Sequence, residues 1–149
     1  MEVLRLAGPP GVGKSTTAWA LATMLVADGA ASGYVAIDQL GMCYPAPDDD
    51  PDRWALKERA LAAIAHEFRR AGAHRLVVSG VAWPDDPPPS IKGVAVQSLW
   101  LDASEETRRR RLWNRGSSEE QLLRLLSAGT AESARVNPVW ERLATAWSL

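Results

Sequence analysis

Residues 8–15 read Gly-Pro-Pro-Gly-Val-Gly-Lys-Ser, and they constrain the fold more than any other segment of the chain. They match the phosphate-binding loop G-x-x-x-x-G-K-[ST], whose backbone N–H groups wrap around phosphate oxygens. An apolar stretch at residues 3–7 precedes the loop, and a helical pattern follows it over residues 14–28. Because the motif functions between a strand and a helix, this context predicts a nucleoside triphosphate site rather than a chance glycine-rich turn.

Individual residues of this loop have expected roles at a bound triphosphate. Lys14 should reach the β- and γ-phosphates, and Ser15 should hold Mg²⁺. The helix that opens at Lys14 should direct its positive N-terminal end at the same phosphates. The predicted nucleotide-binding residues of the loop are Gly8, Gly11, Val12, Gly13, Lys14, Ser15 and Thr16.

Length and composition argue against several classes of protein. The 149 residues fit a single domain, and 17 basic against 18 acidic side chains give a net charge of −1, which argues against general nucleic-acid binding. A single cysteine, Cys43, excludes an internal disulfide and is compatible with a reducing cytosol. There is no charged and apolar leader, and no stretch reaches about 18 uninterrupted apolar residues. We therefore expect a cytoplasmic protein, without a membrane segment, that binds a small, compact substrate.

Apolar runs and helical patterns alternate along the chain. Strands are predicted at residues 3–7, 34–37, 76–78 and 94–101. Helices are predicted at residues 14–28, from an Asp50 N-cap to about residue 71, from a cap at Asp102 or Ser104 to Arg115, and after a capping box of Ser117 and Glu120. Four prolines between residues 83 and 89 predict an irregular crossover. This alternation predicts an α/β fold with a mainly parallel sheet of four strands, or five if the C-terminus supplies one.

Asp38 directly follows the predicted strand at residues 34–37 and is a candidate catalytic residue. The carboxyl ends of parallel strands form the rim where open α/β sheets bind ligands, so this carboxylate should face the loop at residues 8–15. It could accept a proton from an attacking hydroxyl, or hold Mg²⁺ directly or through water. The alternative is that Asp38 only caps a turn, and the strand-end position favours the functional role.

A run of arginines at residues 108–111, followed by Arg115, forms a second cluster. Residues three and four apart share a helix face, so Arg108, Arg111 and Arg115 should align. Arg109 and Arg110 should point elsewhere, toward solvent. Because aligned guanidinium groups can neutralise a triphosphate, we expect Arg111 and Arg115 to contact phosphate. RNA binding is the alternative, but no other basic stripe supports it.

The segment between the second strand and the helix after it could supply a pocket for an acceptor molecule. It combines apolar and aromatic walls with cationic tips, although Trp54 is expected to be mainly a packing residue. The acidic triplet at residues 48–50 is interpreted as a solvated loop with one helix cap, not as a metal cluster. The candidate pocket residues are Met42, Cys43, Tyr44, Arg53, Trp54 and Lys57.

Together these features resemble the small-molecule and nucleoside-monophosphate kinase branch of the P-loop NTPases, which includes adenylate, shikimate and gluconate kinases and chloramphenicol phosphotransferase. The resemblance extends from Met1 to about Gly116. The arginine pair Arg111 and Arg115 is similar to the lid motif of that branch. Residues 34–38 are similar to the strand that ends in the catalytic aspartate of the phosphotransferase.

The resemblance implies that the chain binds ATP and Mg²⁺ and catalyses phosphoryl transfer. Lys14 would serve the phosphates, Asp38 would serve the acceptor hydroxyl, and magnesium would rest on Ser15 and Asp38. The implied catalytic residues are Lys14, Asp38, Arg111 and Arg115, and the two arginines would also bind the nucleotide.

Two features depart from the pattern of this branch. Residues 76–78 end in Ser79-Gly80, where many relatives carry an acidic residue of Walker B type. Family members also usually have a fifth strand. After residue 129 the sequence offers only residues 131–136 and a terminal helical segment with Val139, Leu143 and Trp147, so the C-terminal part is predicted to be shortened.

The expected function is ATP-dependent phosphoryl transfer to a hydroxyl of a small molecule, either a metabolite or an antibiotic. A nucleoside-monophosphate kinase is one alternative, and it would need paired arginines around the acceptor, where only Arg53 is an obvious candidate. A nucleotide-binding regulatory protein with little catalysis is the other alternative. The absent Walker B acid and the shortened C-terminus favour it.

Overall fold

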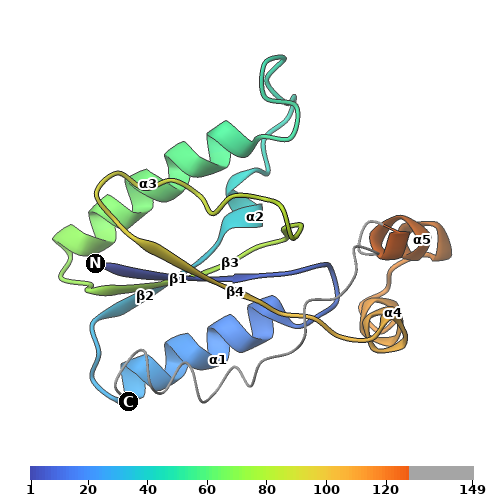
Figure 1. Cartoon of the computed structure of the whole chain (residues 1–149), viewed down its shortest axis with the longest axis horizontal. Helices are drawn as coiled ribbons and strands as arrows, with labels where there is room; N and C mark the ends of the chain where they lie inside the picture. Colours follow the sequence, from blue (N-terminus) through green and yellow to red (C-terminus); the bar gives the residue numbers. More distant parts are fainter. Residues whose placement is uncertain (128–149) are drawn as a thin grey trace.

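The computed structural model describes residues 1–127, in which one sheet lies between helices on its two faces (Figure 1). Helices follow each of the strands except the third, which leads directly to the fourth. The elements are β1 (Glu2–Ala7), α1 (Lys14–Ala27), β2 (Ser32–Ala36), α2 (Ile37–Leu40), α3 (Trp54–Arg70), β3 (Arg75–Ser79), β4 (Val96–Trp100), α4 (Glu105–Trp113) and α5 (Glu119–Ser127).

The four strands are parallel and lie in the order β2-β3-β1-β4. Leu4 of the central strand β1 lies opposite Val77 of β3 and Gln97 of β4. Val77 in turn lies opposite Tyr34 of β2. The predicted α/β fold with a parallel four-stranded sheet is therefore confirmed, and the carboxyl ends of all strands meet at one edge, where such sheets bind ligands.

Strand β1 is buried on both faces, because parallel sheets are covered on both sides. On one face Leu4 and Leu6 pack against Leu21 of α1. On the other face Val3 packs with Leu61 of α3. Burying a side chain of this size stabilises a fold by roughly 1.5–3 kcal/mol, so the two helices hold the strand that carries the phosphate-binding loop.

Two predicted boundaries near the second and third helices differ from the structure. Asp38 lies in the first turn of α2 rather than at a strand end, because the chain turns after Ala36 and buries Ile37 in the core. Helix α3 begins at Trp54, later than predicted. Asp50 still caps it from a distance, since its carboxylate accepts the N–H groups of Ala55 and Leu56 at 3.2 and 2.8 Å.

Helix α4 begins at one of its two predicted caps and ends earlier than predicted. The hydroxyl oxygen of Ser104 accepts the N–H of Thr107 at 3.3 Å, which makes Ser104 the cap. The helix ends at Trp113, so Arg115 lies in the turn that follows. Gly116 has a φ of 84° and ends this turn in the left-handed region that favours glycine.

The capping box of α5 is one residue later than predicted. The N–H of Ser118 donates to the side-chain oxygen of Gln121 at 2.9 Å, and the N–H of Gln121 donates to the Ser118 hydroxyl at 3.3 Å. The box predicted at Ser117 and Glu120 is therefore wrong. Gln121 supplies the same reciprocal bond that a glutamate would supply.

The crossover from β3 to β4 has no helix, which confirms the prediction from its four prolines. It passes on the side of the sheet that α3 covers, and the N–H of Ser90 donates to the Glu58 carboxylate at 2.8 Å (Figure 1). The features predicted at residues 131–136 and at Val139, Leu143 and Trp147, and the question of a fifth strand, lie outside the described residues.

The capping box of α5 gives a direct test of its register. Ser118→Ala should lower the free energy of unfolding by about 1 kcal/mol, because an N-terminal donor of α5 loses its acceptor. The matched control Ser117→Ala should change it by less than about 0.5 kcal/mol. Urea unfolding of both variants measures the difference, and a larger loss for Ser117→Ala would contradict the register.

Candidate active site

The loop between β1 and α1 has a backbone that favours glycine at three positions, Gly8, Gly11 and Gly13. Gly8 has a φ of 145°, and a Cβ there would lie 2.2 Å from the carbonyl oxygen of Leu101. Gly13 has a φ of 107° and occupies the N-cap of α1, where it offers no side chain to the first N–H groups of the helix. These N–H groups have no intrahelical partner, so this end of α1 can bind an anion.

Lys14 lies within the loop with its ammonium turned back on the backbone. The side chain is 7% exposed, and Nζ donates to the carbonyl oxygen of Pro9 at 2.9 Å. Burial is the main reason that the pKa of Lys14 is lowered to about 8. The carboxylate of Asp38 acts to raise this pKa, and the charges of Arg115 and Arg108 act to lower it. The environment therefore disfavours the charged ammonium, and a bound phosphate would favour it.

Arg111 reaches the same loop from α4. Its Nη1 donates to the carbonyl oxygen of Val12 at 2.7 Å and lies 3.4 Å from that of Gly11. A Cβ at Gly13 would lie 3.6 Å from this nitrogen. Arg111, one of the two predicted arginines, therefore lies at the phosphate-binding loop although about 100 residues separate the two in sequence.

Arg115 and Arg111 line a cavity of about 400 Å³ beside the loop, here called the loop cavity. Arg115 reaches it from the turn after α4, and its charge acts on Lys14. The cavity lies over the first turn of α1, which contributes the predicted residue Thr16. Its lining residues are Val12, Gly13, Thr16, Thr17, Arg111, Asn114 and Arg115.

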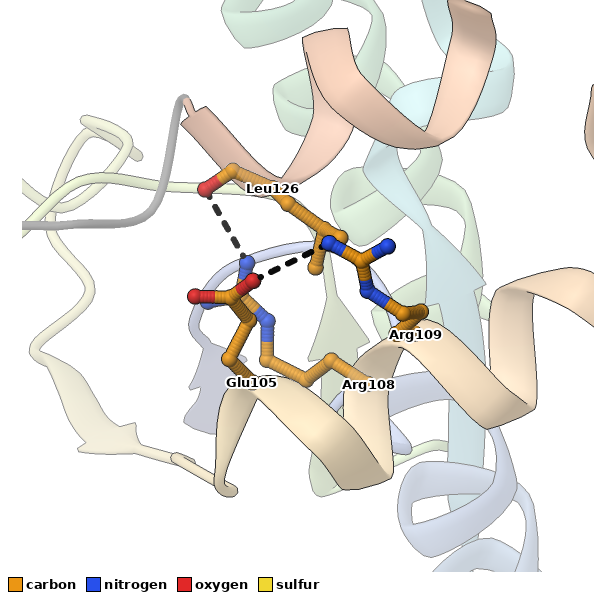
Figure 2. Close-up of polar contacts among 4 residues, drawn as sticks. All are labelled: Glu105, Arg108, Arg109 and Leu126. Atoms are coloured by element: carbon orange, nitrogen blue, oxygen red, sulfur yellow. Dashed lines mark hydrogen bonds and ion pairs between the residues drawn. The ribbon is translucent and has the colours of Figure 1, made fainter. Parts of the chain in front are cut away.

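The predicted alignment of Arg108, Arg111 and Arg115 on one helix face is wrong at Arg115, because α4 ends at Trp113. Arg108 is buried and does not line the loop cavity. Its side chain is 4% exposed, and Nη2 lies 3.4 Å from the carbonyl oxygen of Leu126 at the end of α5 (Figure 2). The helix ends before Arg115, and the packing of α5 against α4 covers Arg108. Arg109 instead bonds Glu105 on its own helix at 3.3 Å, in an exposed ion pair.

Asp38 is exposed and is held at the carboxyl end of β3. Its Oδ2 accepts the N–H of Val81 at 2.9 Å. The N–H groups of Gly80 and Ala82 on the same segment donate to the carbonyl oxygens of Leu6 and Gly8, at 3.2 and 3.4 Å. Residues 80–82 therefore connect the candidate catalytic carboxylate to the strand and loop that carry the phosphate site.

A second cavity, of about 470 Å³, is lined in part by Asp38 and is here called the tryptophan cavity. It includes Trp54 and Lys57, two of the candidate pocket residues. Met42 and Tyr44 are 85% and 95% exposed and do not line it. The cavity is lined by Asp38, Asp52, Trp54, Lys57, Val81, Trp83, Asp86 and Pro87.

Sequence reasoning missed several residues around the tryptophan cavity. Asp52, Trp83 and Asp86 come from loops whose course the sequence did not predict. Arg5 lies beneath the cavity, with its guanidinium 5.8 Å from the ring centre of Trp54. A signal existed in the sequence, because Arg5 is a charge within the apolar strand at residues 3–7.

Oxygen ligands for a magnesium ion are present near the loop. Ser15 is exposed in the first turn of α1, and Asp38 is exposed in the first turn of α2. Mg²⁺ usually binds one or two protein oxygens together with phosphates and water, so these groups fit it. Ser79 cannot replace a Walker B acid, since it is buried and its hydroxyl bonds that of Tyr34 at 2.9 Å. Within residues 1–127, no three His, Cys, Asp or Glu side chains form a metal cluster.

A family model described as AAA domain matches residues 5–133, which is most of the chain. The chain belongs to this family. It has the P-loop kinase-like fold, which the phosphate-binding loop and the parallel sheet already indicate. A search of curated protein sequences gave no match.

Two solved structures share the fold at low sequence identity. The crystal structure of APE1195 has a TM-score of 0.58 and 19% identity, covering 99% of this chain and 93% of the other. Shikimate kinase from Acinetobacter baumannii, in complex with shikimate, has a TM-score of 0.53 and 14% identity, covering 99% of this chain and 94% of the other.

No helix within the described residues is long and apolar enough to span a membrane.

The lowered pKa of Lys14, about 8, gives a test in solution. Phosphate charge raises the pKa of the ammonium on binding, so near pH 9 ATP should bind with uptake of up to about one proton. Near pH 6.5 Lys14 is already protonated, and uptake at this site should be close to zero. Calorimetric titration in buffers of different ionisation enthalpy measures this. Lys14→Arg is the matched control, and an uptake in that variant equal to the wild-type value would contradict the assignment.

Proposed function

We propose that the chain transfers the γ-phosphoryl group of ATP to a hydroxyl group of a small molecule. The observation that carries this proposal is that Lys14 lies within electrostatic reach of one residue from each of the two cavities. Its ammonium interacts electrostatically with Asp38, which lines the tryptophan cavity, and with Arg115, which lines the loop cavity. A donor in the loop cavity and an acceptor in the tryptophan cavity would meet at the loop, which is the arrangement that direct transfer needs.

The residues of the loop cavity suit the phosphates of the donor. The N-terminal N–H groups of α1 and the ammonium of Lys14 would bind phosphate oxygens. Arg111 and Arg115 would neutralise the charge that spreads over the transferring group. Lys14 and Arg111 now bond loop carbonyls, so ATP would take over donors that are already gathered there.

Asp38 would act on the acceptor. Its carboxylate would accept the proton of the attacking hydroxyl as the acceptor oxygen bonds to the γ-phosphorus. The bond from the γ-phosphorus to the bridging oxygen breaks, and ADP leaves with that electron pair. Ser15 and Asp38 would hold Mg²⁺, which when bound neutralises phosphate charge.

A small acceptor is better supported than a nucleoside monophosphate. Arg53 was the obvious arginine for a monophosphate, but its Nε donates to the carbonyl oxygen of Cys43 at 2.8 Å and it does not line the tryptophan cavity. Lys57 is the one cation in the lining of that cavity. The fold shared with a shikimate kinase also supports a small hydroxylated acceptor.

A product assay tests the proposal. The protein, ATP and Mg²⁺ are incubated with a panel of hydroxylated metabolites and antibiotics, and phosphorylated product is detected by mass spectrometry. ADP and phosphorylated acceptor should appear in equal amounts. Lys14→Ala should bind ATP weakly and form neither product, because the phosphate charge loses its closest cation. ADP without phosphorylated acceptor would contradict the proposal.

Asp38→Asn separates catalysis from binding. The amide oxygen can still accept the N–H of Val81, so the segment around Gly80 should keep its position. If Asp38 acts chiefly as the general base, turnover should fall by about 10²–10⁴-fold while ATP affinity stays within about twofold. Partial rescue by added Mg²⁺ would assign Asp38 to the metal. Unchanged turnover would remove it from the mechanism.

The arginines of α4 and of the turn after it should differ sharply in how much each contributes to turnover. Arg115→Ala and Arg111→Ala should each lower turnover by at least about tenfold, or about 1.4 kcal/mol in the barrier. Arg110 is exposed and lies away from the loop, beside Trp113 and Glu119. Arg110→Ala should therefore stay within about threefold of wild type. Steady-state kinetics decide this, and equal losses at all three positions would point to a diffuse basic surface.

One observation favours a second candidate, a nucleotide-binding regulatory protein with little catalysis. The end of β3 carries the buried hydroxyl of Ser79, so this strand supplies no carboxylate to the metal. In that case ATP would bind with Mg²⁺ but no acceptor in the panel would be phosphorylated. Calorimetric ATP binding beside the product assay separates the two candidates.

A further inference from the structure

Arg5 is a charged side chain buried in the centre of the sheet. It lies in β1 and is 2% exposed. Side chains alternate along a strand, so Arg5 points to the same face as Val3, which packs with Leu61 of α3. An apolar residue would be the ordinary choice at this position.

The contacts of Arg5 leave much of the guanidinium unsatisfied. Nη1 donates to the carbonyl oxygen of Pro87 at 3.1 Å, and the guanidinium carbon lies 5.8 Å from the ring centre of Trp54. Nε and Nη2 are buried and have no hydrogen-bond partner among residues 1–127. Burial lowers the pKa of Arg5, while Asp86 and Asp38 act in the opposite direction. Buried donors without partners destabilise a fold, so Arg5 is a poor choice for stability alone.

Both contacts of Arg5 end on walls of the tryptophan cavity. Pro87 belongs to the crossover between β3 and β4, and Trp54 begins α3. The two carboxylates that act on Arg5, those of Asp38 and Asp86, line the same cavity. One guanidinium therefore contacts the crossover and α3 and interacts electrostatically with two carboxylates of the cavity.

We propose that Arg5 is a positioning residue of the acceptor site: it holds the proline-rich crossover and Trp54 in place around the tryptophan cavity, at a cost to the stability of the fold. The kinetic part of this inference rests on the proposed function. The structural part does not, because it concerns the order of the crossover in the free protein. The crossover has no helix or strand of its own between residues 80 and 95, so it is fixed by individual contacts such as those of Arg5 with Pro87 and of Ser90 with Glu58.

Three variants test this role. Arg5→Met fills similar space without charge. Arg5→Lys keeps the charge but has a single donor nitrogen. Val3→Ala is the control on the same face of the same strand. Arg5→Met should unfold at the wild-type temperature or above, because the unsatisfied donors are removed. Val3→Ala should unfold at a lower temperature, because it leaves a cavity in the core.

Two measurements would not change if Arg5 only stabilised the fold: amide hydrogen exchange in the crossover, and binding of the acceptor. In Arg5→Met, amide hydrogen exchange at residues 81–86 should be at least about tenfold faster than in wild type, while exchange in α1 keeps its wild-type rate. The KM for the acceptor should rise at least about tenfold with the KM for ATP unchanged. Arg5→Lys should recover part of both losses, and Val3→Ala should show neither.

The outcomes separate this inference from the proposed function. If wild type phosphorylates no acceptor, the proposed function fails, and exchange at residues 81–86 still decides the role of Arg5. Wild-type exchange in Arg5→Met overturns the inference. An Arg5→Met variant that unfolds at a lower temperature than wild type, or does not fold, also overturns it, because Arg5 would then serve the fold.

Discussion

The parallel pairing of β1 with β3 is the constraint on which the site depends. It places the end of β3 beside the phosphate-binding loop, where the N–H groups of Gly80 and Ala82 reach the carbonyl oxygens of Leu6 and Gly8. The next N–H along, that of Val81, holds the Asp38 carboxylate. Gly80 is required at this point, since a Cβ there would lie 2.3 Å from Cγ2 of Ile37. The backbone N–H groups of Gly80, Val81 and Ala82 thus fix the distance between the Asp38 carboxylate and the phosphate-binding loop.

The loop itself is stabilised by the cations that would later bind the ligand. Lys14 bonds the carbonyl oxygen of Pro9, and Arg111 bonds that of Val12. A carbonyl oxygen does not neutralise a buried positive charge as a phosphate would. Burial therefore still lowers the pKa of Lys14. Because the donors are already placed at the loop, little reorganisation is needed on binding, which is how preorganised sites gain affinity.

The sequence predicts those parts of the fold that local rules decide. The glycines of the loop, the Ser104 cap and the irregular crossover follow from backbone preferences and from proline. The parallel sheet follows from the alternation of elements. The errors have a different origin. The burial of Arg108 depends on α5, 18 residues further along the chain, and Asp52, Trp83 and Asp86 of the tryptophan cavity come from loops with no periodic pattern. The α5 cap was misplaced because Glu120 and Gln121 can each complete a capping box.

The central claim is that the loop, its two cations and Asp38 form one site for ATP, and a crystal structure with a non-hydrolysable ATP analogue and Mg²⁺ tests it most directly. The account predicts that Nζ of Lys14 leaves the carbonyl oxygen of Pro9 for a β- or γ-phosphate oxygen, and that Arg111 leaves Val12 for the phosphates. The terminal phosphate should face Asp38 and the tryptophan cavity. A nucleotide bound elsewhere, or bound while Lys14 and Arg111 keep their carbonyl partners, would contradict the account.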